Sequence, residues 1–231
     1  MKDKFSNQIN KYWKNLNKEK LHMCPSISLF RILSQNKIKI SKKNILDIGF
    51  GEGQNLLECQ KRGANVFGIE LREKKIRDMN QAYKIPRKRL FKCDLNKKLP
   101  LITKKFKLIF SLDTFNYITF ENQIKLVDYI HNHLSQGGYF LFQYPQAQLI
   151  QQQKRNFLDY SIDKKKYVIK KKFYPEINPV IFLSDKHIAN LIKLNKKKFK
   201  LLSSSFDIGT FSKNDSSLLT INRFLLFKKK K

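Results

Sequence analysis

A chain of 231 residues, 41% of them hydrophobic, is long enough to bury the core of one large domain. Its formal net charge of +30 suggests a polyanionic partner, but 40 of the 48 basic residues are lysines, and bidentate phosphate contacts favour arginine. A compositional bias, in which lysine, asparagine and isoleucine rise together, explains the charge equally simply, so both interpretations stay open.

The three cysteines, Cys24, Cys59 and Cys93, stand far apart and form no C-x-x-C pair. This spacing predicts reduced thiols in a cytoplasmic protein and gives no support for a metal site. The N-terminus lacks an apolar signal core, and no run approaches the roughly 18 apolar residues that a membrane-spanning helix needs. We therefore expect no transmembrane segment, although the lysines leave peripheral contact with a membrane open.

Residues 1–40 are predicted to form an N-terminal helical cap of two helices, separated at Pro25. Trp13, on the first helix, is expected to anchor that helix on the sheet rather than to stack on a ligand. Residues 44–56 then read N-I-L-D-I-G-F-G-E-G-Q-N-L, which predicts a strand, a glycine loop and a helix. Glycines at alternate positions permit a tight turn and a close ligand, and the helix N-terminus offers free N–H groups.

The details of this loop argue against a dinucleotide, because Gln54 replaces the last small residue of G-x-G-x-x-G and because Asp47 and Glu52 are acidic. Acidic groups suit a cationic ligand. The segment D-I-G-F-G-E-G resembles the first motif of the class I S-adenosylmethionine-dependent methyltransferases. The resemblance implies a Rossmann-like, doubly wound, mostly parallel seven-stranded α/β sheet with a C-terminal antiparallel hairpin. It also implies S-adenosylmethionine as the cofactor, bound by Asp47, Gly49, Gly51 and Gly53.

Gly63 is predicted to end the helix after the loop, and a second strand over residues 65–69 leads into Glu70. A carboxylate at this place can accept both ribose hydroxyls of the cofactor, although a plain surface carboxylate is the alternative. The resemblance places Leu71 beside the adenine. After a helix at 73–83 and a third strand at 90–93, it assigns Asp94 and the N–H of Leu95 to the adenine ring; Asp94 also suits an Asx-turn that closes the strand.

The fourth strand, residues 106–111, ends in Ser111, which we count among the cofactor-binding residues. Open α/β sheets bind ligands beyond the carboxyl ends of their strands, so Asp113 and Tyr117 are the candidate catalytic residues. Many relatives carry a histidine at the position of Tyr117, so this tyrosine is expected to shape the pocket. Asp113 either accepts a hydrogen bond from a ligand or caps the next helix. Residues 112–115 lack the prolines typical of enzymes that methylate exocyclic amines, which favours small-molecule, lipid or saccharide acceptors.

A helix at 121–134, a glycine turn at 136–138 and a fifth strand at 139–143 complete the parallel part of the sheet. The two histidines near the end of that helix, His131 and His133, are expected to have surface or helix-terminus roles rather than to catalyse. Residues 145–183 are predicted to form a substrate lid over the site, and within them residues 163–174 alternate basic with aromatic or β-branched residues, which predicts a strand or hairpin. The lysines of this segment suit an anionic acceptor or simply a solvated face.

The last helix is predicted to begin at Ser184, followed by an antiparallel pair at 199–206 and 218–227 with a polar loop between them. Residues 41–231 thus form the methyltransferase domain. We expect an enzyme that transfers a methyl group by in-line displacement to an oxygen or nitrogen of a small molecule, lipid or saccharide. An RNA methyltransferase that uses the basic surface and a non-catalytic S-adenosylmethionine-binding module are the alternatives.

Overall fold

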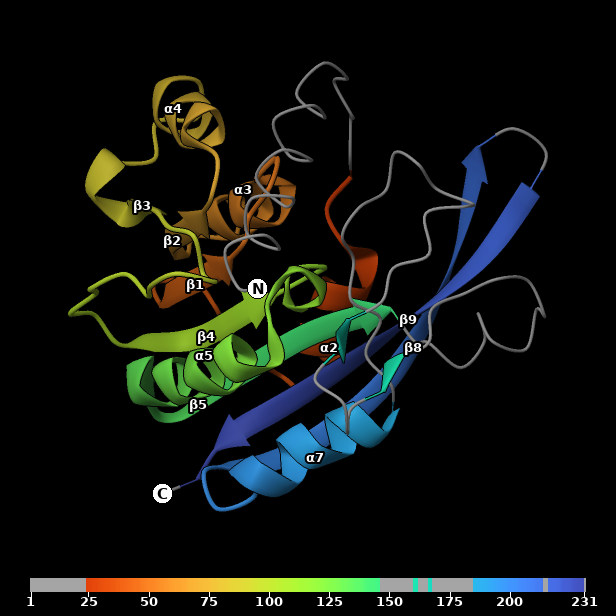
Figure 1. Cartoon of the computed structure of the whole chain (residues 1–231). Coiled ribbons are helices and arrows are strands. Elements are labelled where there is room, and N and C mark those ends of the chain that lie inside the picture. Colours follow the sequence, from red (N-terminus) through yellow and green to blue (C-terminus); the bar gives the residue numbers. More distant parts are fainter. Residues whose placement is uncertain (1–23, 146–159, 162–165, 168–184, 214–215, 231) are drawn as a thin grey trace.

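The structure, a computed structural model, describes residues 24–145, 160–161, 166–167, 185–213 and 216–230. Its main sheet has seven strands in the order β3-β2-β1-β4-β5-β9-β8 (Figure 1). Strands β1 to β5 are parallel to one another, whereas β9 is antiparallel to both of its neighbours, β5 and β8. This confirms the predicted Rossmann-like sheet. The bounds are β1 Asn44–Ile48, β2 Asn65–Glu70, β3 Leu90–Lys92, β4 Phe106–Ser111, β5 Leu134–Pro145, β8 Phe199–Lys213 and β9 Ser216–Lys229.

Helices cover both faces of this sheet and bury two apolar clusters against it (Figure 1). Successive strand residues alternate between the clusters, as Ile45 and Leu46 of β1 do, because strand side chains point to opposite faces. One cluster includes residues of α2 (Ile27–Gln35), α3 (Gln54–Lys61) and α4 (Glu73–Gln81). The other includes residues of α5 (Phe120–His133) and α7 (Asp185–Asn195), and two short 3₁₀ turns, η2 (Arg87–Arg89) and η3 (Phe115–Tyr117), join neighbouring elements.

Gly63 ends α3 as predicted. Its φ is +79°, its N–H donates to the carbonyl of Gln60 at 2.9 Å, and the N–H of Ala64 donates to the carbonyl of Cys59 at 3.0 Å. These two bonds form a Schellman motif, which satisfies carbonyls that a helix end would otherwise leave without partners. The turn brings the chain straight back into β2.

The predicted start of the fifth strand is wrong. Strand β5 begins at Leu134, immediately after α5, so residues 136–138 belong to a strand instead of a turn. The register between β4 and β5 shifts at Phe106 to Leu108, and Gly137 has φ +64° within this irregularity. A Cβ on Gly138 would lie 2.8 Å from the carbonyl oxygen of Ser135. Gly137 and Gly138 therefore allow a β-bulge within the strand instead of the predicted turn.

The terminal hairpin is longer than predicted. Strand β8 extends to Lys213 and β9 begins at Ser216, so Gly209 and most of the predicted loop pair as strand. Trp13 and the first predicted helix lie outside the described residues, as does most of the predicted lid. Within the lid segment the structure describes a short antiparallel pair, β6 (Tyr160–Ser161) and β7 (Lys166–Tyr167).

All three cysteines are free thiols; Cys24 is exposed, and Cys59 and Cys93 are buried. Burial raises the pKa of the Cys59 thiol to about 12 and that of Cys93 to about 11. Among the described residues, no helix combines the length and the apolar character that a membrane crossing requires.

Candidate active site

The glycine loop lies at the carboxyl end of β1 and is fixed on both sides. Gly49, Gly51 and Gly53 have φ values of +78°, +56° and +82°, which side-chain-bearing residues rarely adopt. A Cβ on Gly49 would lie 2.2 Å from the Thr114 hydroxyl oxygen, and one on Gly53 would lie 2.5 Å from the Met79 side chain. A Cβ on Gly51 would make only ordinary contacts, the nearest with Arg72 Nη2 at 3.8 Å, so this position is less crowded than the other two.

Glu70 ends β2 beside this loop, and its side chain is held from two directions. The N–H of Gly51 donates to Oε2 at 2.9 Å, and the backbone N–H and the Nε–H of Arg72 both donate to Oε1 at 3.0 Å. Glu70 is only 6% exposed, so it is not a plain surface carboxylate. A carboxylate offers about four acceptor positions, and these three donors leave about one for a ribose hydroxyl.

Asp47, on β1, is buried, and its Oδ2 has no hydrogen-bond partner. Burial, reinforced by the negative charge of Glu70, raises the pKa of Asp47 well above its ordinary value. A buried carboxyl oxygen without a donor destabilises the protein unless a ligand supplies one. The unpartnered Asp47 oxygen and the Glu70 carboxylate, on either side of the glycine loop, fit a ligand that has a cationic group and a ribose.

Glu52 contributes less negative charge to the loop than the sequence suggests. Lys75 of α4 forms an ion pair with Glu52 Oε2, and Nη1 of Arg72 lies 3.7 Å from Glu52 Oε1. Two cations thus offset this carboxylate. Since Arg72 also forms an ion pair with Glu70, the negative charge that remains for a cationic ligand comes mainly from Asp47, when it is ionised.

The other predicted cofactor residues lie along the same edge of the sheet. Leu71 follows Glu70 directly and is partly buried. Asp94 closes β3 with the predicted Asx-turn, since its Oδ1 accepts the N–H of Asn96 at 3.0 Å. Leu95 packs against the cluster on the α5 face. Ser111 is fully buried, and its hydroxyl donates to the carbonyl of Ile48 at 3.1 Å, so it joins the carboxyl ends of β4 and β1.

Asp113, just beyond β4, has a φ of +53°, a left-handed conformation that aspartate tolerates better than most residues. The side-chain nitrogen of Gln143, a buried residue of β5, donates to Asp113 Oδ1 at 2.8 Å. Asp113 keeps exposed surface, yet surrounding protein desolvates its carboxyl group and raises its pKa to about 6, while the Gln143 hydrogen bond lowers it. The N-caps of η3 and α5 are Thr114 and Thr119, so Asp113 caps neither helix.

Asn96 connects the loops after β3 and β4. Its Nδ2 donates to the carbonyl of Tyr117 at 2.8 Å, and its Oδ1 accepts the N–H of Thr119 at 2.9 Å. Tyr117 lies in η3, partly buried. Sequence reasoning missed Asn96, Gln143 and Arg72. Only Gln143 gave a signal, as a polar residue at the carboxyl end of an otherwise apolar strand.

Of the surface or helix-terminus roles predicted for the two histidines, the structure shows a helix-terminus role for His133. Both are partly buried, and the ring nitrogens of His133 lie 2.8 Å from the carbonyls of Tyr129 and Ile102, so His133 anchors the end of α5. His131 packs edge-on against Phe199. Neither histidine contacts the glycine loop.

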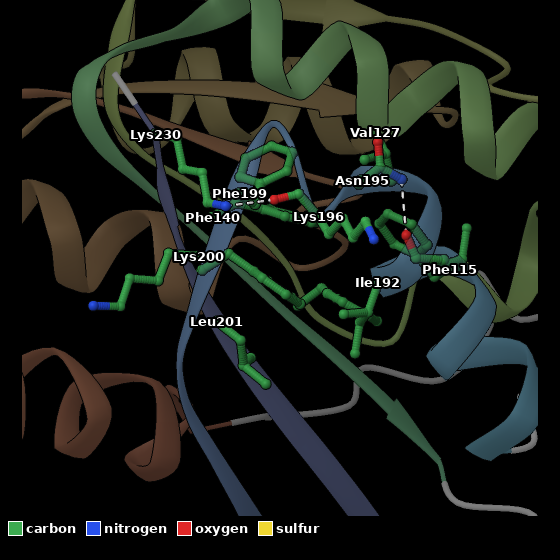
Figure 2. Close-up of a pocket in the computed structure, with 13 residues that line it drawn as sticks. Phe115, Val127, Phe140, Ile192, Asn195, Lys196, Phe199, Lys200, Leu201 and Lys230 are labelled. Carbon is green, nitrogen blue, oxygen red and sulfur yellow. Dashed lines mark hydrogen bonds between the residues drawn. The ribbon is translucent and has the colours of Figure 1, made fainter.

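A pocket of about 230 Å³ lies between α5, α7 and the sheet (Figure 2). Its wall is mainly phenylalanine and aliphatic side chains, among them Phe115 and Phe199, with Lys196, Lys200 and Lys230 also lining it. None of the predicted site residues lines this pocket. It is therefore separate from the glycine loop and from Asp113.

Comparison with known proteins agrees with this geometry. Residues 45–138 match the family model described as a methyltransferase domain. A search of curated proteins gave no match. The fold is similar to the PH0226 protein from Pyrococcus horikoshii, at 16% identity and a TM-score of 0.63 over 88% of this chain and 89% of that one. It is also similar to an S-adenosylmethionine-dependent methyltransferase from Clostridium acetobutylicum, at 16% identity and a TM-score of 0.61 over 88% and 89%.

A third similar structure is the N-methyltransferase NodS from Bradyrhizobium japonicum in complex with S-adenosyl-L-homocysteine, at 13% identity and a TM-score of 0.56 over 88% of this chain and 85% of that one. Identities this low establish the fold alone, which is that of an α/β methyltransferase. The match over residues 45–138 identifies a methyltransferase domain, so the chain is an enzyme, and its fold is that of the α/β methyltransferases. Of the similar structures, one is named as S-adenosylmethionine-dependent and another holds S-adenosyl-L-homocysteine.

Proposed function

We propose that the enzyme methylates an oxygen or nitrogen of a small-molecule, lipid or saccharide acceptor, with Asp113 as the proton acceptor. The observation that carries this proposal is the Asp113 carboxyl group, bonded to Gln143 at the sheet edge that also holds the glycine loop. Thr114, the next residue, packs directly against Gly49 of that loop. The loop and the Asp113 segment therefore belong to one site.

Each residue of this site has a distinct task in the proposal. The glycine loop lets the backbone approach the cofactor closely, Glu70 accepts a ribose hydroxyl and Asp47 faces the cationic part of the cofactor. S-adenosylmethionine, when bound, supplies an electrophilic methyl group for in-line displacement by the acceptor atom. Asp113 takes the proton from that acceptor atom, and Gln143 fixes the orientation of the carboxylate. Tyr117, in η3, shapes the acceptor side.

The acceptor class rests on sequence features around this site. Residues 112–115 contain no proline, unlike the tetrapeptide of enzymes that methylate exocyclic amines. The predicted lid at 145–183 carries two lysine triplets, Lys164 to Lys166 and Lys170 to Lys172, which suit an anionic acceptor. The similar NodS structure is named as an N-methyltransferase, which is consistent with transfer to nitrogen.

Calorimetry with S-adenosylhomocysteine tests the cofactor part of the proposal. The wild-type protein should bind it, and Glu70→Ala should weaken binding at least tenfold, because a hydrogen bond to a charged group contributes about 1.5 to 3 kcal/mol. Glu58→Ala is the matched control, since Glu58 forms an exposed ion pair with Arg62 on α3. Binding that is absent in the wild type, or equally tight in Glu70→Ala, would refute the assignment.

Transfer of a labelled methyl group into fractionated cell extract tests the reaction and finds the acceptor. We expect the label in a fraction of small molecules, lipids or saccharides. Label in RNA would favour the RNA methyltransferase alternative. Cofactor binding without any transfer would favour a non-catalytic module.

A further inference from the structure

We propose that Arg72 is a positioning residue for the cofactor, because it holds the Glu70 carboxylate in the orientation that ribose recognition requires. This inference rests on the proposed role of Glu70. It assigns a positioning role to Arg72, which takes no part in the methyl transfer and lies outside the glycine-loop motif.

The contacts of Arg72 with Glu70 are unusually concentrated. Arg72 lies two residues beyond the end of β2, at the N-cap of α4, and its backbone N–H and Nε–H both donate to the same oxygen, Oε1 of Glu70, at 3.0 Å. The side chains are 11% and 7% exposed, so solvent screens this ion pair only weakly. Two donors on one buried oxygen allow the carboxylate little freedom to rotate.

The second oxygen of Glu70 is fixed by the glycine loop itself. The N–H of Gly51 donates to Oε2 at 2.9 Å, and Arg72 Nη2 would lie 3.8 Å from a Cβ on Gly51, so the guanidinium runs beside the loop. Nη1 of the same guanidinium is 3.7 Å from Glu52 Oε1. Arg72 therefore connects the end of β2 with the loop after β1. In the proposed site these two segments contact the ribose from two sides.

Arginine suits this task better than lysine. Its planar guanidinium directs several N–H groups at fixed angles and can serve Glu70 and Glu52 at once, whereas a lysine ammonium is a single point charge. A preoriented carboxylate also loses less conformational entropy when the ligand binds, so the ligand binds more tightly. Removal of the guanidinium would leave Glu70 as a buried carboxylate without its cation.

Calorimetric titration with S-adenosylhomocysteine tests the inference on the variants Arg72→Ala, Arg72→Lys and Arg72→Gln. We expect Arg72→Ala to bind about 10- to 100-fold more weakly than the wild type, because one charged hydrogen bond of about 1.5 to 3 kcal/mol is lost. Arg72→Lys should recover only part of this affinity, and Arg72→Gln, which keeps an N–H donor but no charge, should recover less. Arg62→Ala, which breaks the exposed Arg62–Glu58 pair on α3, is the control and should bind as the wild type does.

A double-mutant cycle separates positioning from a general structural effect. If Arg72 acts through Glu70, the variant that combines Arg72→Ala with Glu70→Ala should bind no more weakly than Glu70→Ala alone. Additive losses, or an Arg72→Ala affinity within twofold of the wild type, would overturn the inference. If Arg72→Ala does not fold, as judged by near-UV circular dichroism, the same cycle with Arg72→Gln decides. A wild-type protein that does not bind the ligand refutes the proposed cofactor site itself, which is a different result.

Discussion

Asp113 is the residue whose ionisation should set the pH dependence of methyl transfer. Desolvation by the surrounding protein raises the pKa of its carboxyl group to about 6, and a carboxyl group accepts a proton only when it is ionised. The rate should therefore increase as the pH rises through about 6 and become constant above it. Asp113→Asn should lower kcat by about 10² to 10⁴ and remove this step, while the affinity for S-adenosylhomocysteine stays the same.

The measurement is a pH–rate profile with an acceptor found by labelled transfer. Asp128→Asn is a suitable control, because Asp128 lies on α5 in an exposed ion pair with Lys198, away from the loop. An inflection that persists unchanged in Asp113→Asn would assign the titration to another group.

Asp47 should make the cofactor-free protein less stable as the pH rises. Its pKa is raised in the folded state by burial and by Glu70, so the folded protein keeps a proton that the unfolded chain releases near the ordinary value of 3.8. The folded state thus binds more protons in this window, and the free energy of unfolding falls as the pH increases until the folded pKa is passed.

Asp47→Asn removes this titration, so the variant should gain in melting temperature over the wild type as the pH rises above about 4. The same variant should bind S-adenosylhomocysteine about ten- to a hundredfold more weakly, because a charged hydrogen bond contributes about 1.5 to 3 kcal/mol. Thermal unfolding across a pH series and calorimetry measure the two effects. A melting-temperature difference that does not change with pH would show that Asp47 is already ionised in the free protein.

At the level of single residues, the sequence predicted those site residues whose place follows from the order of strands and loops along the chain. Asp47 lies in the apolar run just before the glycine loop, and Glu70 ends the next apolar run. The place of each in a parallel sheet could therefore be inferred. Arg72 and Gln143 could not be assigned in this way, because their importance comes from one hydrogen bond each to a carboxylate. Such bonds depend on side-chain directions that spacing does not determine.

At the level of elements, β1, the glycine loop and α3 were predictable because the apolar run, the glycines and the helix end lie next to one another in the chain. The start of β5 was not. Gly137 and Gly138 suit a turn and a bulge equally well, and the pairing of this segment with β4 decides between them. The extension of β8 and β9 has the same origin, since serine and glycine favour strands weakly and pair here only because each strand supplies the other's partners.

At the level of the whole molecule, one group of described lysines lies away from the site. Lys43, Lys107 and Lys228 gather near the amino ends of the parallel strands, where burial and the charges of Lys228 and Lys43 lower the pKa of Lys107. The glycine loop and Asp113 are at the opposite edge. A field centred on the amino edge attracts polyanions without guiding them to the reacting atoms.

We therefore expect any RNA binding to be independent of sequence and steeply dependent on salt, as lysine-phosphate contacts are. Bulk RNA should bind at low salt, dissociate near 0.15 M salt and leave methyl transfer to the acceptor unchanged there. Filter binding over a salt series, with the transfer assay in parallel, checks both points. Competitive inhibition by RNA at physiological salt would favour the RNA methyltransferase alternative.

Because β9 lies between β5 and β8 in the sheet, the sheet cannot be completed until β9 has been synthesised. Strand β8 is made before β9 but pairs in the sheet only with β9, which also pairs with β5. Phe224 to Phe227 of β9 fill both apolar clusters, so neither face of the sheet is complete until these residues have left the ribosome. A nascent chain that ends in β8 would expose the edge of β5 and the apolar side chains around it. During translation the enzyme should thus depend on protection of this edge until its last strand emerges.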